Sequence, residues 1–159
     1  MLNRLNIFYK KKILIYGLGK SGLSVLKFLK KNNEIITHDD KINDDIKEIK
    51  KIKFDYIIIS PGIDIDKCKL SKFLKNNLKK IYTDLDIFYS QYKKNSKITI
   101  TGTNGKSTTA KILYDVLKDQ KVDARLVGNI GNPILLEKKV TKRTVFVIEA
   151  SSYQLEYSK

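Results

Sequence analysis

The chain has 159 residues, of which 42% are hydrophobic and 31% are charged. A chain of this length and composition can bury the core of one ordinary domain or two small ones, which excludes wholesale disorder. The formal net charge is +15, but the basic residues are nearly all lysines scattered along the chain, so we expect a solvated lysine surface and no nucleic-acid partner.

The single cysteine, Cys68, excludes an intramolecular disulfide and a cysteine-based zinc site, and we expect it to be a small core residue. No stretch approaches the ~20 consecutive apolar residues of a membrane span, and the first residues lack a signal-peptide pattern. We therefore expect a cytoplasmic protein without membrane insertion.

Short runs rich in Ile, Val and Tyr alternate with longer segments of helical period, which predicts an α/β fold with parallel strands. The predicted strands are 13–16, 34–37, 56–60, 80–82, 97–101, 124–127 and 144–149. Apolar stripes predict helices whose buried faces carry Leu23, Leu26 and Leu29; Ile42, Ile46 and Ile49; Leu70, Phe73, Leu74 and Leu78; and Ala110, Leu113 and Leu117.

The first predicted strand runs into a glycine loop, Gly17 to Gly22, with the pattern G-x-G-x-x-G. Such a loop at a helix start approaches phosphates closely, and a carboxylate of Asp39 or Asp40 could accept a hydrogen bond from a ribose. The residues alone leave two interpretations open: a dinucleotide site, or a tight turn that binds nothing. His38, the only histidine, is expected to be a surface hydrogen-bonding residue.

The second glycine loop, Gly102 to Thr108, reads GTNGKST between a predicted strand and a predicted helix. Its backbone N–H groups would cradle a polyphosphate, Lys106 would place a charge on the phosphates, and the Ser107 hydroxyl would ligate Mg²⁺. The usual P-loop pattern would need a glycine where this chain has Ile100. Glu149, after a buried strand, is a candidate second ligand for Mg²⁺.

A polar, lysine-rich segment separates the two loops and predicts a domain boundary near 93–96. The segment after it offers about three strands, fewer than the usual four to six, so the second domain looks incomplete. Asn129, in the turn cluster GNIGNP, could either read a ligand or cap a helix.

Six motifs occur in the same order in the Mur ligase family, which this chain resembles: IYGLGKSGLS, SPGI, DLDIF, ITGTNGKST, GNIGNP and EASSYQLE. Within the family, the resemblance is greatest to the branch that adds D-glutamate to UDP-N-acetylmuramoyl-L-alanine. It implies a Rossmann-like parallel-sheet domain over residues 1–93 that binds the UDP of this substrate. A truncated P-loop-type α/β domain over residues 94–159 would bind ATP.

The resemblance also implies roles for individual residues. The UDP substrate would be bound by Lys20, Ser21, Asp39, Asp40, Lys41, Ser60, Pro61, Gly62, Asn129 and Gln154. ATP would be bound by Gly102, Thr103, Asn104, Gly105, Lys106, Ser107 and Thr108, and Mg²⁺ by Ser107 and Glu149. Lys106 and Glu149 would be the catalytic residues. Lys41 stands where an arginine is common, which puts a bidentate phosphate contact in doubt.

The implied reaction belongs to peptidoglycan precursor synthesis. The ATP γ-phosphate activates the alanyl carboxylate as an acyl phosphate, which the D-glutamate amine then attacks. Family members are far longer, with a second magnesium site and a C-terminal domain that binds D-glutamate, so we expect this chain to be a monomeric fragment that is inactive alone. The alternative is a stand-alone module that binds a uridine nucleotide or an NAD-type dinucleotide.

Overall fold

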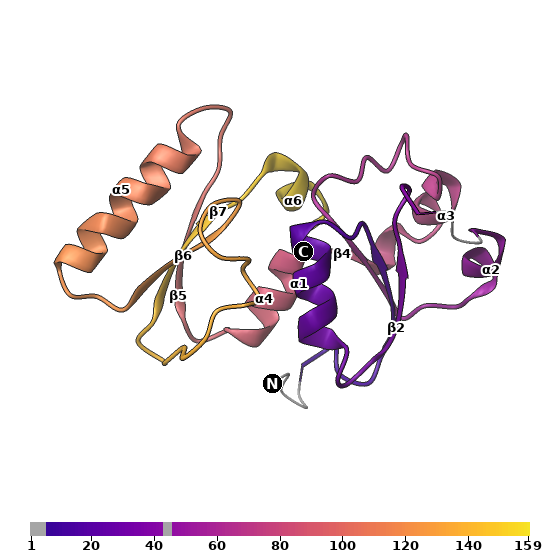
Figure 1. The fold of residues 1–159 in the computed structure, drawn as a ribbon, viewed down its shortest axis with the longest axis horizontal. Coiled ribbons are helices and arrows are strands. Elements are labelled where there is room, and N and C mark those ends of the chain that lie inside the picture. Colours follow the sequence, from indigo (N-terminus) through magenta and orange to yellow (C-terminus); the bar gives the residue numbers. More distant parts are fainter. Residues whose placement is uncertain (1–5, 43–45) are drawn as a thin grey trace.

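The computed structural model describes residues 6–42 and 46–159, which form two parallel sheets (Figure 1). The strands are β1 (Lys12–Tyr16), β2 (Glu34–His38), β3 (Tyr56–Ile59), β4 (Ile81–Tyr82), β5 (Ser96–Ile100), β6 (Ala124–Gly128) and β7 (Val145–Glu149). The first sheet has the order β2-β1-β3-β4 and the second β5-β7-β6. All seven predicted strands are present with slightly different ends, and the predicted α/β class is confirmed.

The helices in the described residues are α1 (Lys20–Leu29), α2 (Ile46–Lys51), α3 (Ser71–Lys75), α4 (Asp84–Gln91), α5 (Lys106–Asp119) and α6 (Ser152–Tyr157). A short 3₁₀ helix, Leu78–Lys80, precedes β4. The stripe predicted from Ile42 crosses residues 43–45, which lie outside the described residues, and α2 begins at Ile46.

The first sheet is buried on both faces. From β1, Ile13 and Ile15 point to one face, where α1 and α4 pack, while Leu14 and Tyr16 point to the other, where α2 and α3 pack. All four side chains have no solvent exposure. Helices on both faces of a parallel sheet make the doubly wound arrangement, in which ligands bind beyond the carboxyl ends of the strands.

Two of the predicted helix faces are partly wrong. Leu23 is 53% exposed, because α1 buries its small residues Gly22, Ser24 and Val25 instead, which lets the helix approach the preceding loop closely. Leu78 is also exposed, since α3 ends at Lys75 and the chain continues as the 3₁₀ helix.

Helix α4 connects the two sheets. Its Phe88 ring meets the Phe146 ring of β7 edge-on at 4.7 Å between centroids, and one apolar cluster contains side chains from both sheets. Figure 1 shows α1, α4 and α6 between the two sheets. The predicted junction at 93–96 ends at Ser96, the first residue of β5, while the division into domains 1–93 and 94–159 stays a prediction.

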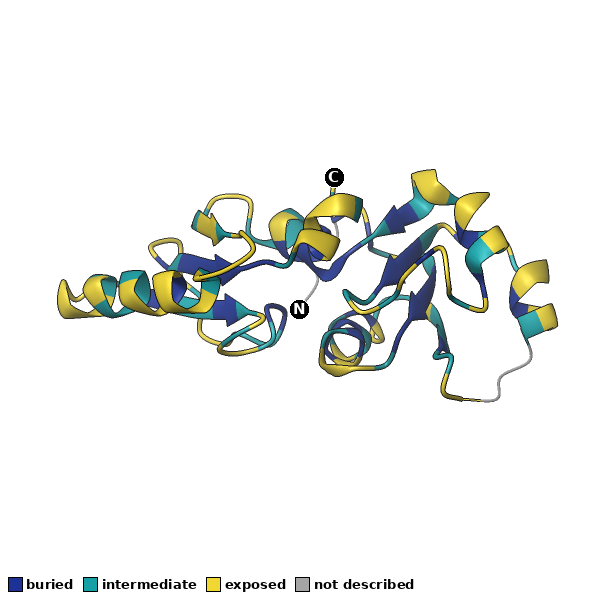
Figure 2. Ribbon diagram, turned by 90° about the horizontal axis from the view of Figure 1, so that it is seen from above, coloured by how far each residue is buried: buried dark blue, intermediate teal, exposed yellow. Residues whose placement is uncertain are grey.

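Helix α5 lies on the second sheet and contacts all three of its strands. Ala110 is fully buried there, whereas Ile112 and Val116 of α5 and Ile98 of β5 are exposed, as the colouring of Figure 2 indicates for the helix. Across residues 6–42 and 46–159, no helix combines the length and apolar character needed to cross a membrane.

Candidate functional site

A cavity of about 620 Å³ lies at the carboxyl ends of β1 and β3 and reaches the end of β6. Nine of the ten residues predicted to bind the UDP substrate line it: Lys20, Ser21, Asp39, Asp40, Lys41, Ser60, Pro61, Gly62 and Asn129. The further lining residues are Gly17, Gly19, Ile63, Asp64, Lys67, Cys68 and Gly128. The cavity lies where the strand order of the first sheet reverses, between β1 and β3, which is where ligands bind in such sheets, and it also includes residues from the second sheet.

The first glycine loop forms one wall of this cavity. The Ser60 hydroxyl donates to the Gly17 carbonyl at 2.7 Å, joining the ends of β1 and β3. A Cβ atom on Gly22 would lie 1.8 Å from the same carbonyl, so only glycine allows α1 to begin so close to the loop. Among the described residues, none accepts a hydrogen bond from the backbone N–H groups of residues 19–22. These N–H groups at a helix start are available to an anion.

Asp39 holds this loop to the end of β2. Its Oδ2 accepts from the Leu18 N–H at 2.7 Å, and its Oδ1 accepts from the Lys41 N–H at 3.0 Å. The bond from Leu18 is the main reason why the pKa of Asp39 lies below its ordinary value, which keeps the carboxylate charged. Because each carboxylate oxygen can accept more than one bond, Asp39 can still accept from a ribose hydroxyl.

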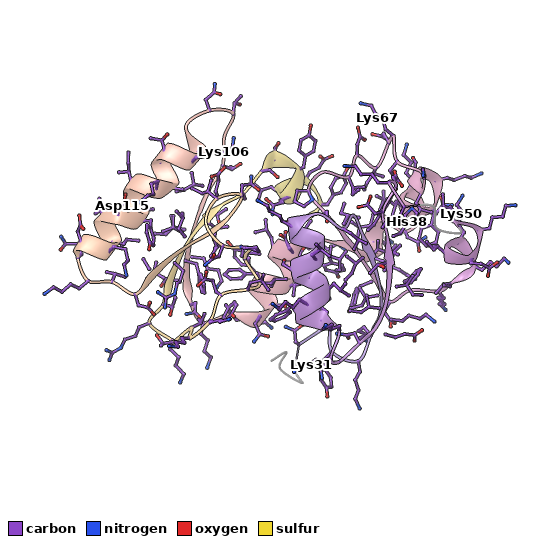
Figure 3. All side chains as sticks on the ribbon, viewed as in Figure 1. Lys31, His38, Lys50, Lys67, Lys106 and Asp115 are labelled. Atoms are coloured by element: carbon purple, nitrogen blue, oxygen red, sulfur yellow. The ribbon has the colours of Figure 1, made fainter. Side chains whose placement is uncertain are left out.

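Asp40 lies over a buried aromatic pair. The Tyr16 hydroxyl donates to Asp40 Oδ1 at 2.5 Å, and His38 Nε2 lies 3.3 Å from the same oxygen. Burial by itself would raise the pKa of Asp40, but hydrogen bonds, first from Tyr16 and then from the Lys69 N–H, lower it. His38, labelled in Figure 3, is fully buried beside Tyr16, so its predicted surface position is wrong.

The loop after β3 supplies wall residues that sequence reasoning missed. Lys67, labelled in Figure 3, pairs with Asp64 at 3.3 Å, and Cys68 lines the cavity half-buried rather than filling the core. These residues follow Ser60 to Gly62 in the chain, and that position at a strand's carboxyl end is the signal that could have found them. Together with Lys20 and Lys41, Lys67 gives the cavity a positive rim suited to phosphates.

The second glycine loop is exposed and precedes α5. Lys106, labelled in Figure 3, folds back so that its ammonium donates to the carbonyls of Gly102 at 2.6 Å and Thr103 at 3.1 Å. In the described part of the chain, the backbone N–H groups of residues 102–108 donate to no other residue. A row of free N–H groups beside a lysine is the arrangement that binds a polyphosphate.

Glu149 ends β7, where it pairs in register with Ile100, the last residue of β5 before the second glycine loop. Its side chain is buried, and its Oε2 atom finds no hydrogen-bond partner within the described residues. A buried carboxylate oxygen without a partner is costly unless a cation or a donor satisfies it. Glu149 therefore fits Mg²⁺, which prefers oxygen ligands, while the Ser107 hydroxyl as a second protein ligand stays a prediction.

Gln154 is the predicted substrate residue that does not line the cavity. It is 2% exposed, and its Nε2 donates to Asp84 Oδ1 at 3.0 Å in the interior between α4 and α6. Its predicted contact with the substrate stays a prediction. The described residues also contain no group of three or more His, Cys, Asp or Glu side chains that could hold a metal, so Mg²⁺ would depend on phosphate or water for its other ligands.

Comparisons with known proteins match either part of the chain or nearly all of it. The family model of the Mur ligase middle domain matches residues 100–159. UDP-N-acetylmuramoylalanine--D-glutamate ligase of Rickettsia bellii is 34% identical over 98% of this chain and 37% of that protein. The protein of the same name from Clostridioides difficile is 35% identical over 92% of this chain and 37% of that protein. The chain belongs to the Mur ligase family.

This Mur ligase chain thus spans about 37% of the length of these relatives. The crystal structure of UDP-N-acetylmuramate:L-alanyl-gamma-D-glutamyl-meso-diaminopimelate ligase from Neisseria meningitides matches with a TM-score of 0.52 and 15% identity, covering 89% of this chain and 52% of that one. That likeness confirms the fold. The relatives' D-glutamate ligase names agree with the branch that the motifs indicated.

Proposed function

We propose that this chain is the UDP-substrate-binding and ATP-binding part of a ligase that adds D-glutamate to UDP-N-acetylmuramoyl-L-alanine. The observation that carries the proposal is one cavity built by the first glycine loop and by Asn129, whose backbone is bonded to Glu149. A substrate in this cavity would be bound by one sheet and would extend toward the magnesium carboxylate of the other.

Within the cavity, the free N–H groups of residues 19–22 and the Lys20 ammonium would bind the diphosphate. Asp39 and Asp40 would face the uridine, with Lys41 and Ser60 to Gly62 completing the wall. Asn129 would contact the substrate from the side of the second sheet. These roles are supported by the shared cavity and by the relatives' name.

At the second loop, Lys106 would leave the two carbonyls that it now contacts and bind the ATP phosphates together with the N–H groups of residues 102–108. Ser107 and Glu149 would hold Mg²⁺, which neutralises charge on the transferring phosphoryl group when it is bound. Lys106 and the N–H groups contribute fixed positive charge and dipoles at the same place. Lys106 and Glu149 are therefore the proposed catalytic residues.

These 159 residues would bind the UDP substrate and the nucleotide, but they would not form the amide by themselves. The relatives that carry the ligase name are much longer, since this chain spans about 37% of their length. We propose a monomeric, cytoplasmic protein for this role. Phosphate release that requires both ATP and D-glutamate, measured on the purified chain, would contradict the proposed inactivity of the chain by itself.

The two sites can be tested separately by calorimetric titration with UDP-N-acetylmuramoyl-L-alanine and with a non-hydrolysable ATP analogue plus Mg²⁺. Lys20→Ala should lower the affinity for the UDP substrate by about tenfold and leave the affinity for the nucleotide unchanged. Lys106→Ala should do the reverse. Lys72→Ala, at an exposed position of α3 outside the cavity, is the matched control and should change neither affinity. Tighter binding of NADH than of the UDP substrate would instead favour a dinucleotide module.

A further inference from the structure

One buried side chain reaches a wall residue of the substrate cavity without lining the cavity itself. Tyr16, the last residue of β1, has no solvent exposure and is absent from the cavity walls. It packs in the apolar cluster on the α2 and α3 face of the first sheet, where a phenylalanine would fill the same space. Its hydroxyl donates to Asp40 Oδ1 at 2.5 Å, and Asp40 does line the cavity. A buried tyrosine hydroxyl needs a partner, and here the partner is a carboxylate of the proposed binding site.

The other oxygen of Asp40 is held by a different part of the chain. Asp40 Oδ2 accepts from the Lys69 N–H at 3.1 Å, and the Lys69 ammonium donates to the Asp40 carbonyl at 2.6 Å. Lys69 directly follows Lys67 and Cys68, the wall residues that come after β3. Asp40 therefore ties the end of β2 to β1 through Tyr16 and to this wall through Lys69. With one protein donor on each oxygen, the carboxylate has a set orientation.

The adjacent Asp39 is positioned in another way. Its carboxylate accepts from the N–H groups of Leu18 and Lys41, so the backbone around it holds it. Any residue other than proline at these two positions would supply the same donors. The orientation of Asp40, in contrast, depends on one side-chain hydroxyl from the interior of the sheet. The identity of a core residue, Tyr16, therefore affects the wall of the cavity.

The Asp40 carboxylate remains available to a ligand. Its side chain is 31% exposed, and each carboxylate oxygen can accept a further hydrogen bond. Burial alone would raise the pKa of Asp40, but the bonds from Tyr16 and from the Lys69 N–H lower it, which favours the ionised form that only accepts. An ionised carboxylate in a set orientation suits the N–H and O–H donors that a uridine presents.

We propose that Tyr16 is a positioning residue of the substrate cavity: its buried hydroxyl sets the orientation of the Asp40 carboxylate, which accepts a hydrogen bond from the uridine. The inference rests on the proposed function of the cavity. Tyr16 does not touch the ligand, so its effect is transmitted through Asp40. Loss of the hydroxyl leaves the charge of Asp40 in place but frees the carboxylate to turn, and the cost of ordering it again falls on ligand binding.

The test measures binding of UDP and of UDP-N-acetylmuramoyl-L-alanine to the full chain by calorimetric titration. Tyr16→Phe removes only the hydroxyl and should lower both affinities by about tenfold, the loss expected for one hydrogen bond to a charged group. Affinity for a non-hydrolysable ATP analogue with Mg²⁺ should not change, because that ligand is proposed to bind at the second glycine loop. Tyr56→Phe is the matched control: Tyr56 is the first residue of β3, at the opposite end of the sheet from the cavity, and its replacement should change no affinity.

A double-mutant cycle separates positioning from a general disturbance of the cavity. Asp40→Ala should lower the affinity for UDP by about tenfold or more. In that background, Tyr16→Phe should change the affinity by less than about twofold, because the carboxylate through which it acts is gone. A general disturbance would weaken binding by the same factor in both backgrounds. Urea denaturation checks that each variant is folded; if Tyr16→Phe is not, Tyr16→Met, which lacks the hydroxyl and adapts to the available space, takes its place.

The inference is overturned if the folded Phe or Met variant binds UDP within about twofold of wild type. It is also overturned if the variant weakens the full substrate but not UDP, or if its effect is equally large in the Asp40→Ala background. Failure of the proposed function has a different signature. In that case, the wild-type chain itself would bind neither UDP nor UDP-N-acetylmuramoyl-L-alanine.

Discussion

The backbone N–H of Asn129 donates to the carbonyl of Glu149 at 3.0 Å. Asn129 lines the cavity proposed for the UDP substrate, and Glu149 carries the buried carboxylate proposed for Mg²⁺. One hydrogen bond therefore joins the backbone of the proposed substrate cavity's far wall to the backbone of the proposed metal ligand. If both roles hold, this bond helps to keep the two sites in register, and misplacement of reacting groups is costly.

The hydrogen bond between Asn129 and Glu149 depends on the glycine at position 128. Gly128 has a φ of +108°, and a Cβ atom at this position would lie 2.2 Å from the Glu149 carbonyl oxygen. Gly128→Ala should therefore lower the free energy of unfolding by about 2 kcal/mol or more, and it should lower the affinities for the UDP substrate and for the nucleotide. Urea denaturation of Gly62→Ala provides the control, since a Cβ atom there meets nothing within 4 Å. Equal losses of stability in the two variants would refute this account of Gly128.

Glu149→Gln separates stability from function. The substitution keeps the shape of the side chain but removes a buried charge whose Oε2 has no partner in the described residues, so the free energy of unfolding should stay the same or rise. Affinity for the Mg²⁺-nucleotide should fall at least about tenfold, while Mg²⁺-free binding should not change. Calorimetric titration with and without EDTA measures both. A variant that still gains affinity from Mg²⁺ would show that the ion is held elsewhere.

The strands and both loops could be predicted from sequence because their signals are local. Runs of β-branched residues mark buried parallel strands, and the glycine loops have fixed spacing. The face of α1 could not be predicted by hydrophobicity alone, because Gly22 rather than Leu23 meets the loop. The contact between Asp84 and Gln154 could not be predicted either, since two polar residues 70 positions apart leave no periodic signal.

Lys41 offers a test of the cavity's phosphate chemistry. It lines the cavity where an arginine is common in the family. A lysine ammonium binds phosphate as a point charge, whereas an arginine can form two parallel hydrogen bonds. Lys41→Arg should tighten binding of UDP-N-acetylmuramoyl-L-alanine by about threefold to tenfold, without changing nucleotide affinity. Lys72→Arg on α3 controls for the exchange of one cation for another. An unchanged affinity in Lys41→Arg would place position 41 away from the phosphates.

Asp84 should make stability depend on pH in the direction opposite to most carboxylates. Burial raises the pKa of Asp84, and this outweighs the hydrogen bonds from Gln154 and Ser21, which lower it. The folded chain then keeps a proton that the unfolded chain releases above its ordinary pKa of about 3.9. Since the folded state binds more protons, the free energy of unfolding falls as pH rises between the two pKa values, by up to about 1.4 kcal/mol per pH unit.

The comparison with Asp84→Asn isolates this effect, because contributions that the two proteins share cancel in the difference. The two proteins should differ least below about pH 4, and the variant should become progressively more stable than wild type as pH rises, until the folded pKa is passed. Urea denaturation at several pH values measures the difference. A difference that shrinks with rising pH would mean that the folded chain stabilises the charged carboxylate, and that Asp84 acts as an ordinary ion-pairing acid.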